Sequence, residues 1–387
     1  MHVPFCRRRC PYCDFAVTVK AEIPHQEYTE ALLGELRRRQ SEVGTRQVGT
    51  LYFGGGTPSL LATECLEEIV EQIKSRFHLA DELEVTLEAN PNEVSDKRLR
   101  AWREGGINRL SIGCQSFQPR HLHALRRSHD AAEARRAVER ALKVMDRVSI
   151  DLMFAGPSQP LKEWEADLEV LKELVVDHGL DHVSGYNLTI EPGTTFWIRR
   201  KQGIVSVPDD DMAAQMLARL VETTKEVGLE RYEVSNFAAP AAESEHNSGY
   251  WRGRPYLGVG VGAHSLAVDA DGTARRRANP RRFDDYMKRC EELATTERLA
   301  PQKHFAERLF LGARTRYGVA LSALRDVFEK SLGSRRIEYV TEVCDDLVAR
   351  GWMERDPSKI YRPTERGLNF SDSLAEWLFA AATDPVG

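Results

Sequence analysis

The sequence has no long apolar run, no excess of positive charge and no second group of closely spaced cysteines. No stretch approaches the roughly 20 apolar residues of a membrane-spanning helix, so we expect no transmembrane segment. The formal net charge of −5 gives no general attraction to nucleic acid or to anionic membranes. The N-terminus lacks the basic-then-apolar pattern of a secretory signal peptide, which favours a cytoplasmic protein.

The composition is that of a globular protein with an adequate core. Hydrophobic residues make up 42% of the 387 residues and charged residues 29%, and this length suffices for one large domain and a smaller one. The seven cysteines are an odd number in a chain without signs of secretion, which argues against a disulfide framework. We therefore expect free thiols in a reducing compartment.

Three cysteines are concentrated at the N-terminus, where Cys6, Cys10 and Cys13 form a C-x3-C-x2-C arrangement. A [4Fe–4S] cluster normally takes four thiolates, so three would leave one iron open to another ligand. A zinc site usually takes four ligands in two separated pairs. The other cysteines form no such pair, although zinc and purely structural thiols remain the alternatives. They are scattered singly: Cys65, Cys114, Cys290 and Cys344.

Strand patterns alternate with helical patterns about every 30 residues through residue 240. This alternation predicts parallel βαβ units and an α/β fold built as a partial (β/α)6 barrel, more open than the closed eight-stranded TIM barrel. The expected strands are 48–53, 83–87, 109–113, 148–154, 182–188 and 232–235. The expected helices include 27–40, a helix from residue 63, 131–145, 162–175 and 212–227.

Polar and glycine residues stand at the carboxyl ends of several expected strands, where ligands bind in such barrels. Gly54, Gly55 and Gly56 precede Thr57, and without Cβ atoms their backbone lets a ligand approach closely. Exposed N–H groups there would be able to hold a carboxylate, although a tight turn is the alternative interpretation.

The cysteine spacing, with an aromatic residue before the third cysteine, resembles the signature of the radical S-adenosylmethionine (SAM) superfamily. The resemblance implies a [4Fe–4S] cluster on the three cysteines, with SAM chelating the open iron. The segment 52–61 is similar to the GGTP segment of the anaerobic coproporphyrinogen III oxidase group, which lies against the SAM amino group. Matching that group residue by residue implies these SAM-contacting positions: Gly55, Gly56, Thr57, Glu88, Gln115, Arg127 and Asp151.

Within this group, two features resemble the heme chaperone branch, HemW. The coproporphyrinogen enzymes carry a fourth cysteine two residues beyond the third, where this chain has Phe15. They also carry a longer N-terminal extension, for which the start at Met1 leaves no room. The group usually has a tyrosine six residues before the first cluster cysteine. That position would precede Met1, so we expect a truncated or misassigned start.

A third feature lies at 245–251, which resembles the H-N-x-x-Y-W motif that this branch associates with heme. The residues concerned are His246, Asn247, Tyr250 and Trp251. The resemblance implies heme, with His246 able to ligate the iron and both aromatic rings able to stack on the macrocycle. The alternative is that the two aromatic residues are interdomain core and His246 only a hydrogen-bonding loop residue. The nearby arginines at 275–277 and 281–282 are expected in a polar loop around Pro280, either as a solvated cluster or as partners of heme propionates or of the acidic face of a membrane-bound acceptor.

The chain is expected to divide into three segments. Residues 1–240 form the radical SAM partial barrel with its cluster loop, 241–300 the H-N-x-x-Y-W segment and a connection, and 301–387 a winged-helix-like domain. Winged helices often bind DNA. The C-terminal segment, however, contains equal numbers of basic and acidic residues, so we expect no nucleic-acid partner.

The resemblance implies a heme chaperone that binds a [4Fe–4S] cluster, SAM and heme and delivers heme to client hemoproteins, such as membrane-bound respiratory enzymes. It also allows for a homodimer. The alternative function is that of an oxygen-independent coproporphyrinogen III oxidase, a radical SAM enzyme of porphyrin biosynthesis. The sequence leaves open whether the protein is an enzyme and whether SAM is cleaved.

Overall fold

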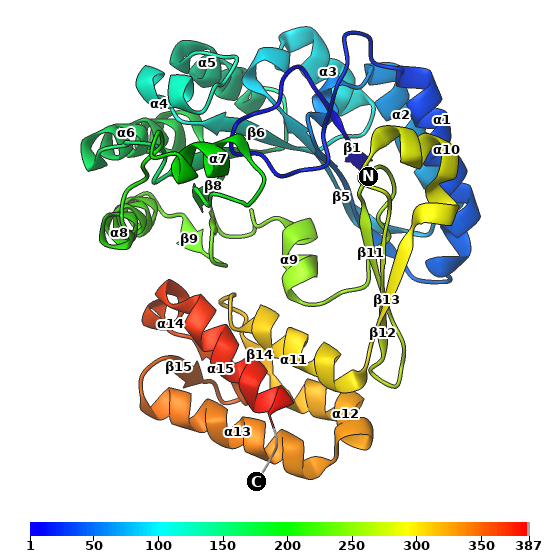
Figure 1. Ribbon diagram of the computed structural model, residues 1–387, viewed down its shortest axis with the longest axis vertical. Helices are drawn as coiled ribbons and strands as arrows, with labels where there is room; N and C mark the ends of the chain where they lie inside the picture. Colours follow the sequence, from blue (N-terminus) through cyan, green and yellow to red (C-terminus); the bar gives the residue numbers. More distant parts are fainter. Residues whose placement is uncertain (385–387) are drawn as a thin grey trace.

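The computed structural model describes residues 1–384 and contains a curved main sheet flanked by helices (Figure 1). The sheet has eight strands in the order β1-β4-β5-β6-β7-β8-β10-β9. Neighbouring strands from β1 to β8 are parallel, as the predicted α/β partial barrel requires, whereas β10 and β9 are antiparallel. The strands are β1 His2–Val3, β4 Val48–Gly55, β5 Leu79–Ala89, β6 Arg109–Gln115, β7 Arg147–Phe154, β8 His182–Asn187, β9 Glu230–Arg231 and β10 Asn236–Ala238.

Helices cover the outer, convex face of this sheet (Figure 1). Their apolar residues recur at helical spacing, and in α2 this places Leu66, Ile69 and Val70 in the core. Hydrophobic burial therefore fixes which side of each helix faces the sheet. The longer helices are α1 His25–Arg39, α2 Thr63–Arg76, α3 Asp96–Glu104, α5 Ala131–Leu142, α6 Leu161–His178 and α8 Asp210–Glu226. Two short helices, α4 Pro119–Ala124 and α7 Thr195–Lys201, follow strands β6 and β8, and α7 lies against the N-terminal segment, where Phe196 N donates to Pro11 O at 2.9 Å.

The sixth predicted strand, 232–235, is not a strand, and the prediction is wrong at this point. These residues form the turn between β9 and β10, closed by a hydrogen bond from Tyr232 N to Asn236 O of 3.1 Å. The Glu233 carboxylate accepts a hydrogen bond from Ser235 N at 3.2 Å and so supports the turn from within. The chain consequently reverses, and β10 pairs with β8 in the antiparallel sense.

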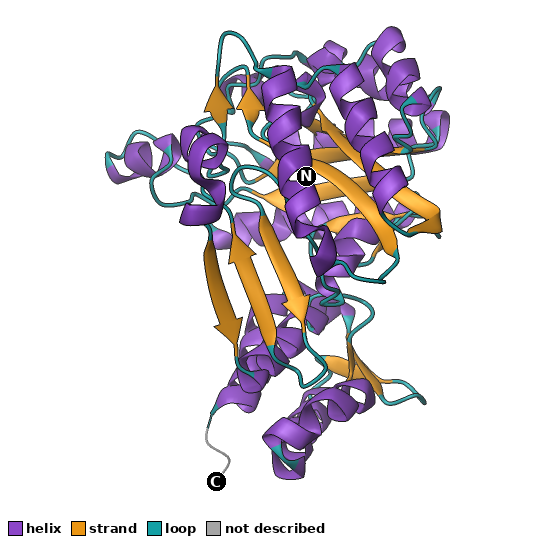
Figure 2. Cartoon of the chain, turned by 90° about the vertical axis from the view of Figure 1, so that its right-hand side faces the viewer, coloured by secondary structure: helices purple, strands orange, loops and turns teal. Residues whose placement is uncertain are grey.

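A second, antiparallel sheet follows, shown face on in Figure 2. Its strands are β11 His264–Val268, β12 Ala274–Ala278 and β13 Thr295–Leu299, accompanied by α9 Glu245–Trp251 and α10 Phe283–Leu293. Arg275, Arg276 and Arg277 belong to β12, so their prediction as loop residues is wrong. Each of these arginines is paired with an acidic side chain at 2.8–3.4 Å, which explains how a strand tolerates three adjacent arginines.

The C-terminal part has its own buried apolar cluster, which includes Phe305, Phe328 and Leu374. Its three-stranded sheet has the order β14-β16-β15, in keeping with a winged-helix outline. The segment boundaries at 240 and 300 stay a prediction. The elements are α11 Pro301–Gly312, β14 Val319–Ala320, α12 Leu321–Leu332, α13 Ser334–Ala349, β15 Met353–Arg355, β16 Ile360–Pro363, α14 Glu365–Asn369 and α15 Ser371–Thr383. Within residues 1–384, no helix combines the length and apolar character needed to cross a membrane.

Candidate functional site

The N-terminal segment that carries Cys6, Cys10 and Cys13, here called the cysteine loop, is fixed to the carboxyl end of β4 by backbone hydrogen bonds. Gly56 N donates to Val3 O at 2.9 Å, and Thr57 N donates to Phe5 O at 2.8 Å. A Cβ atom added at Gly56 would lie 2.8 Å from the backbone of the cysteine loop. The interpretation that these N–H groups are free for a ligand is therefore wrong, because this glycine admits the loop itself.

The three N-terminal cysteines are free thiols, partly exposed, in the loop that follows β1. The loop is closed by the two-residue strands β2 Phe5–Cys6 and β3 Thr18–Val19, which pair with each other. Burial raises the pKa of Cys6 to about 11. Among residues 1–384, no three His, Cys, Asp or Glu side chains converge as ligands of a single metal ion do. In a [4Fe–4S] cluster each iron takes its own thiolate, and three free thiols in one loop are the donor chemistry that such a cluster needs.

Two predicted site residues touch the cysteine thiols. Thr57 Oγ1 lies 3.7 Å from Cys6 Sγ, and Arg127 Nη1 lies 3.7 Å from Cys10 Sγ. Asn90 connects them, because its amide donates to Thr57 Oγ1 at 3.1 Å and its carbonyl accepts from Arg127 Nη2 at 2.5 Å. Asn90 was missed by the sequence analysis as a site residue, although it lies two positions after Glu88 at the same strand end.

One nitrogen of the Arg127 guanidinium is buried and has no hydrogen-bond partner among the described residues. Its Nη2 also donates to Gly113 O at 2.9 Å, while its Nε is buried without a hydrogen-bond partner among the described residues. A buried donor without a partner is costly and marks a place where a ligand acceptor would be stabilising. The guanidinium therefore suits a carboxylate that arrives from the mouth of the barrel.

Gln115 reaches the same place through an irregularity in β6. The pairing of β6 with β7 shifts between Ile112 and Gln115, and Gln115 has a φ of 66°, in the left-handed region. A Cβ atom at Gly113 would lie 3.0 Å from Gln115 Nε2 and 3.4 Å from Arg127 Nη2. The bulge thus turns the Gln115 amide toward Arg127, and strained backbone of this kind is found at functional sites.

Two carboxylates, Glu88 and Asp151, lie at the same ends of the strands as Thr57, Gln115 and Arg127, and we call these five residues the strand-end group. Glu88 accepts hydrogen bonds from the Tyr52 hydroxyl at 2.7 Å and from Gly55 N at 3.1 Å. Asp151 accepts from the Ser111 hydroxyl at 3.2 Å. Burial raises the pKa of both, that of Glu88 to about 7, and the Asp151 charge adds to the effect on Glu88. Two half-buried acids whose charges repel each other favour a cationic ligand between them.

The H-N-x-x-Y-W segment forms helix α9, whose N-terminus rests on a buried carboxylate of β5. Glu84 accepts hydrogen bonds from Glu245 N at 2.9 Å and from His246 N at 3.0 Å. Ser244 caps the helix by accepting from Asn247 N. A carboxylate at the positive end of a helix is stabilising, so Glu84 fixes α9 to the barrel.

His246 is fixed on three sides. Its Nδ1 lies 2.8 Å from the Thr50 hydroxyl, its Nε2 lies 3.0 Å from the Tyr250 hydroxyl, and its ring stacks on Tyr52 at 4.6 Å between centroids. Burial lowers the pKa of His246 to about 3, so the imidazole is neutral at physiological pH. A neutral imidazole is the form that ligates metals.

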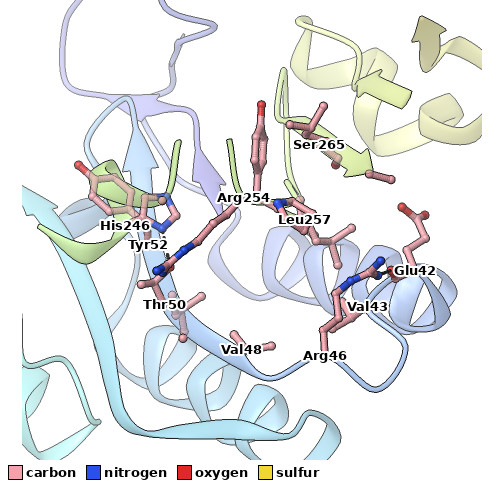
Figure 3. Close-up of a pocket in the computed structure, with 18 of the residues that line it drawn as sticks. Glu42, Val43, Arg46, Val48, Thr50, Tyr52, His246, Arg254, Leu257 and Ser265 are labelled. Carbon is pink, nitrogen blue, oxygen red and sulfur yellow. Dashed lines mark hydrogen bonds between the residues drawn. The ribbon is translucent and has the colours of Figure 1, made fainter. Parts of the chain in front are cut away.

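A cavity of about 880 Å³ opens beside His246 (Figure 3). This volume lies within the range of pockets that bind small molecules and cofactors. His246 and Tyr250 line one side. Arginine side chains from three different segments also line it: Arg46, Arg254, Arg275 and Arg277. Acidic side chains line it as well, and Arg254, Arg275 and Arg277 each lie within 3.7 Å of a carboxylate, so an apolar ligand that carries carboxylates would have to compete for these arginines.

The four predicted motif residues do not all face this cavity. His246 and Tyr250 border it, whereas Asn247 and Trp251 are not among the residues that line it. Successive helical residues are rotated by about 100°, so positions 247 and 251 lie on another face of α9. A ligand in this cavity would meet the ring of Tyr250 and not that of Trp251, and the interpretation in which both rings stack on one macrocycle does not fit this cavity.

The sequence matches the family model of the radical SAM superfamily over residues 1–171. The fold also resembles that of the coproporphyrinogen III oxidase HemN from Escherichia coli, with a TM-score of 0.78, 20% identity, and coverage of 97% of this chain and 88% of that chain. The parallel sheet and the thiol loop at its strand ends thus define a radical SAM protein. Membership of this class implies a [4Fe–4S] cluster and SAM as cofactors.

Similarity to whole proteins narrows the class further. The chain is 33% identical to the heme chaperone HemW of Escherichia coli over 390 residues, covering 98% of this chain and 97% of that protein. It is 31% identical to HemW of Lactococcus lactis, with coverage of 97% and 95%. A 280-residue alignment with the zebrafish mitochondrial radical S-adenosyl methionine domain-containing protein 1 is 40% identical and spans 72% of this chain and 62% of that protein. The chain belongs to the HemW family.

Proposed function

We propose that this protein is a heme chaperone that holds a [4Fe–4S] cluster and SAM at the strand ends and heme beside α9, and that it passes heme to client hemoproteins. The proposal is carried by the similarity to HemW over almost the full length of both chains. It is supported by the place of the motif helix, where His246 borders a cavity of about 880 Å³.

Cys6, Cys10 and Cys13 are the proposed cluster ligands, because they are free thiols that share one short loop. A cluster held there would, when reduced, supply an electron for chemistry on SAM. The protein's part is to hold this loop in place, which the backbone hydrogen bonds at Gly56 and Thr57 do.

The proposed SAM site lies among the strand-end residues beside the cysteine loop. Glu88 and Asp151 would accept hydrogen bonds from the ammonium or the ribose hydroxyls. Arg127 would donate its unpartnered Nε to the carboxylate, with Gln115 beside it. The remaining proposed contacts come from the end of β4 and the residues after it: Gly55, Gly56 and Thr57.

The proposed heme site is the cavity beside α9. Ligation of the heme iron by His246 Nε2 requires the Tyr250 hydroxyl, now 3.0 Å away, to give up its hydrogen bond. Tyr250 is 41% exposed, so its side chain has space to move and then to lie along the macrocycle. Arg46 and Arg254 line the cavity and would donate hydrogen bonds to the propionates. Asn247 and Trp251 would support the helix and not contact the ligand in the cavity.

The proposed partners are heme-accepting client proteins, with membrane-bound respiratory enzymes as candidates, and a homodimer is the proposed assembly. A client must reach the heme edge, and the cavity is accessible beside an exposed Tyr250. We propose a cytoplasmic location for this exchange.

The test is a heme titration of anaerobically reconstituted protein, followed by transfer to an apo-hemoprotein. Wild-type protein should bind about one heme per chain and pass it on. His246→Ala should weaken heme binding by about tenfold or more, corresponding to at least about 1.4 kcal/mol. His178→Ala, a change on helix α6, is the matched control and should leave the titration unchanged.

Two outcomes would overturn the proposal. One is the absence of stoichiometric heme uptake by wild-type protein. The other is conversion of coproporphyrinogen III to protoporphyrinogen IX by the reconstituted protein with SAM and a reductant, which would assign the oxidase function instead.

A further inference from the structure

One side chain, Tyr52 of β4, contacts both the carboxylate of Glu88 at the strand ends and His246 of helix α9. One face of its ring carries the imidazole of His246, with 4.6 Å between the centroids and 15° between the planes. Figure 3 shows the two rings side by side at the wall of the cavity. The hydroxyl at the end of the same ring donates a hydrogen bond to Glu88 Oε1 at 2.7 Å.

The geometry of β4 explains how one residue serves both places. Side chains alternate along a strand, so Thr50, Tyr52 and Gly54 share a face. Thr50 meets His246 Nδ1 at 2.8 Å and so holds the imidazole in its stacked position. A Cβ atom added at Gly54 would lie 2.7 Å from the Tyr52 ring and 3.1 Å from Glu88 Oε1. Glycine at this position therefore leaves the space in which the ring reaches the carboxylate.

Glu88 depends on few donors. Its second oxygen accepts from Gly55 N at 3.1 Å, and the neighbouring Asp151 is a carboxylate that repels it. A hydrogen bond to a charged group contributes more than one between neutral groups. Loss of the Tyr52 hydroxyl would therefore leave Glu88 Oε1 free to rotate away from its present direction.

We infer that Tyr52 is a positioning residue that fixes Glu88 through its hydroxyl and makes the orientation of that carboxylate depend on His246 through its ring. The SAM site and the heme site are thereby coupled, and the inference rests on the proposed function for the identity of the two ligands. Such coupling is reciprocal: heme must change the affinity for SAM by the same factor by which SAM changes the affinity for heme.

The experiment compares wild-type protein with Tyr52→Phe, which keeps the ring and removes the hydroxyl. Both are reconstituted with the cluster, and the dissociation constant for SAM is measured by equilibrium dialysis with and without bound heme. In Tyr52→Phe we expect an affinity for SAM about five- to tenfold lower, from the loss of a charge-assisted hydrogen bond. The effect of heme on SAM affinity should fall toward a factor of one.

The matched control is Tyr361→Phe in the C-terminal part. Tyr361 also donates to a carboxylate, that of Asp345 at 2.8 Å, but far along the chain from the site. This control should keep the SAM affinity of the wild type. A spectroscopic measurement separates a change in the position of Glu88 from a general loss of structure. Addition of SAM should change the electron paramagnetic resonance spectrum of the reduced cluster in the wild type and in the control. In Tyr52→Phe the change should be different.

The outcomes distinguish this inference from the proposed function. If wild-type protein binds SAM and heme, but Tyr52→Phe has wild-type SAM affinity and an unchanged spectrum, the inference is wrong and the proposed function stands. If wild-type protein binds heme but the two ligands do not affect each other, the coupling is absent. If wild-type protein binds neither ligand, the proposed function fails first.

Discussion

Arg127 places Nη1 of its guanidinium 3.7 Å from the sulfur of Cys10, while Nη2 donates hydrogen bonds to the Asn90 side chain and the backbone of Gly113. A fixed positive charge beside a cluster ligand favours the reduced, more negative form of the cluster. Hydrogen bonds to the sulfur atoms act in the same direction.

The first prediction concerns this charge. Arg127→Gln should lower the reduction potential of the reconstituted cluster by on the order of 60 mV or more, because about 59 mV corresponds to a tenfold change for a one-electron couple. The potential is measured by redox titration followed by electron paramagnetic resonance. Arg120→Gln, which removes a surface ion pair with Glu163, serves as control and should leave the potential unchanged. An unchanged potential in Arg127→Gln would contradict the electrostatic role.

The second prediction concerns cluster ligation. Serine at Cys6, Cys10 or Cys13 should remove most of the bound iron and acid-labile sulfide after anaerobic reconstitution, because a hydroxyl is a poor replacement for a thiolate ligand. Cys65→Ser is the control, since that thiol is buried in helix α2 and is not part of the cysteine loop. Iron content and the visible charge-transfer absorption are the measurements. Equal iron loss in the Cys65 variant would point to unfolding instead of lost ligation.

The third prediction concerns the attachment of α9. Glu84→Gln should lower the free energy of unfolding by about 1–3 kcal/mol, because a buried carboxylate that accepts two backbone hydrogen bonds is replaced by an amide. Heme affinity should fall as well, since α9 carries His246. Urea denaturation and heme titration measure the two effects. Glu342→Gln, at an exposed position, should be neutral in both, and neutrality of Glu84→Gln would remove its proposed role.

The fourth prediction concerns pH. Burial raises the pKa of Glu88 to about 7 from its ordinary value of 4.5, so between these values the folded protein binds more protons than the unfolded chain. Its contribution to stability is therefore largest at low pH and is lost as pH rises through about 7. The apo-protein should lose on the order of 2 kcal/mol between pH 5 and 8 from this group.

The variant Glu88→Gln should show a flatter dependence of unfolding free energy on pH and should gain stability relative to wild type above pH 7. Urea denaturation at several pH values tests this. Parallel curves for the two proteins would mean that Glu88 does not titrate in this range.

Much of the barrel could be predicted because each element carries its own periodic pattern. The apolar spacing of Leu66, Ile69 and Val70 marks one face of α2 whatever lies opposite. The prediction of a strand at Tyr232–Ser235 was wrong for the same reason, namely that it rested on the local apolar pattern alone. Tyr232 is buried and Phe237 follows shortly after, so a turn closed by polar contacts of Glu233 has the appearance of a short buried strand.

The site residues divide in a similar way. Resemblance indicated Thr57 and Arg127, and both lie against the cysteine thiols. Tyr52 and Glu84 were missed, because their roles depend on partners brought together by the fold. The Tyr52 hydroxyl meets a residue 36 positions away, and Glu84 meets backbone groups more than 160 positions away. Such contacts depend on strand register and helix placement, which a single sequence does not reveal.

The seating of the cysteine loop on β4 has an evolutionary consequence. Main-chain atoms of Val3 and Phe5 make the hydrogen bonds that hold it, so the position of the thiols does not depend on which side chains the loop displays. The side chains of Arg8 and Arg9 are exposed and take no part in these backbone hydrogen bonds. Substitutions at these two positions can therefore change the charge around the thiols while the backbone that positions the thiols stays in place.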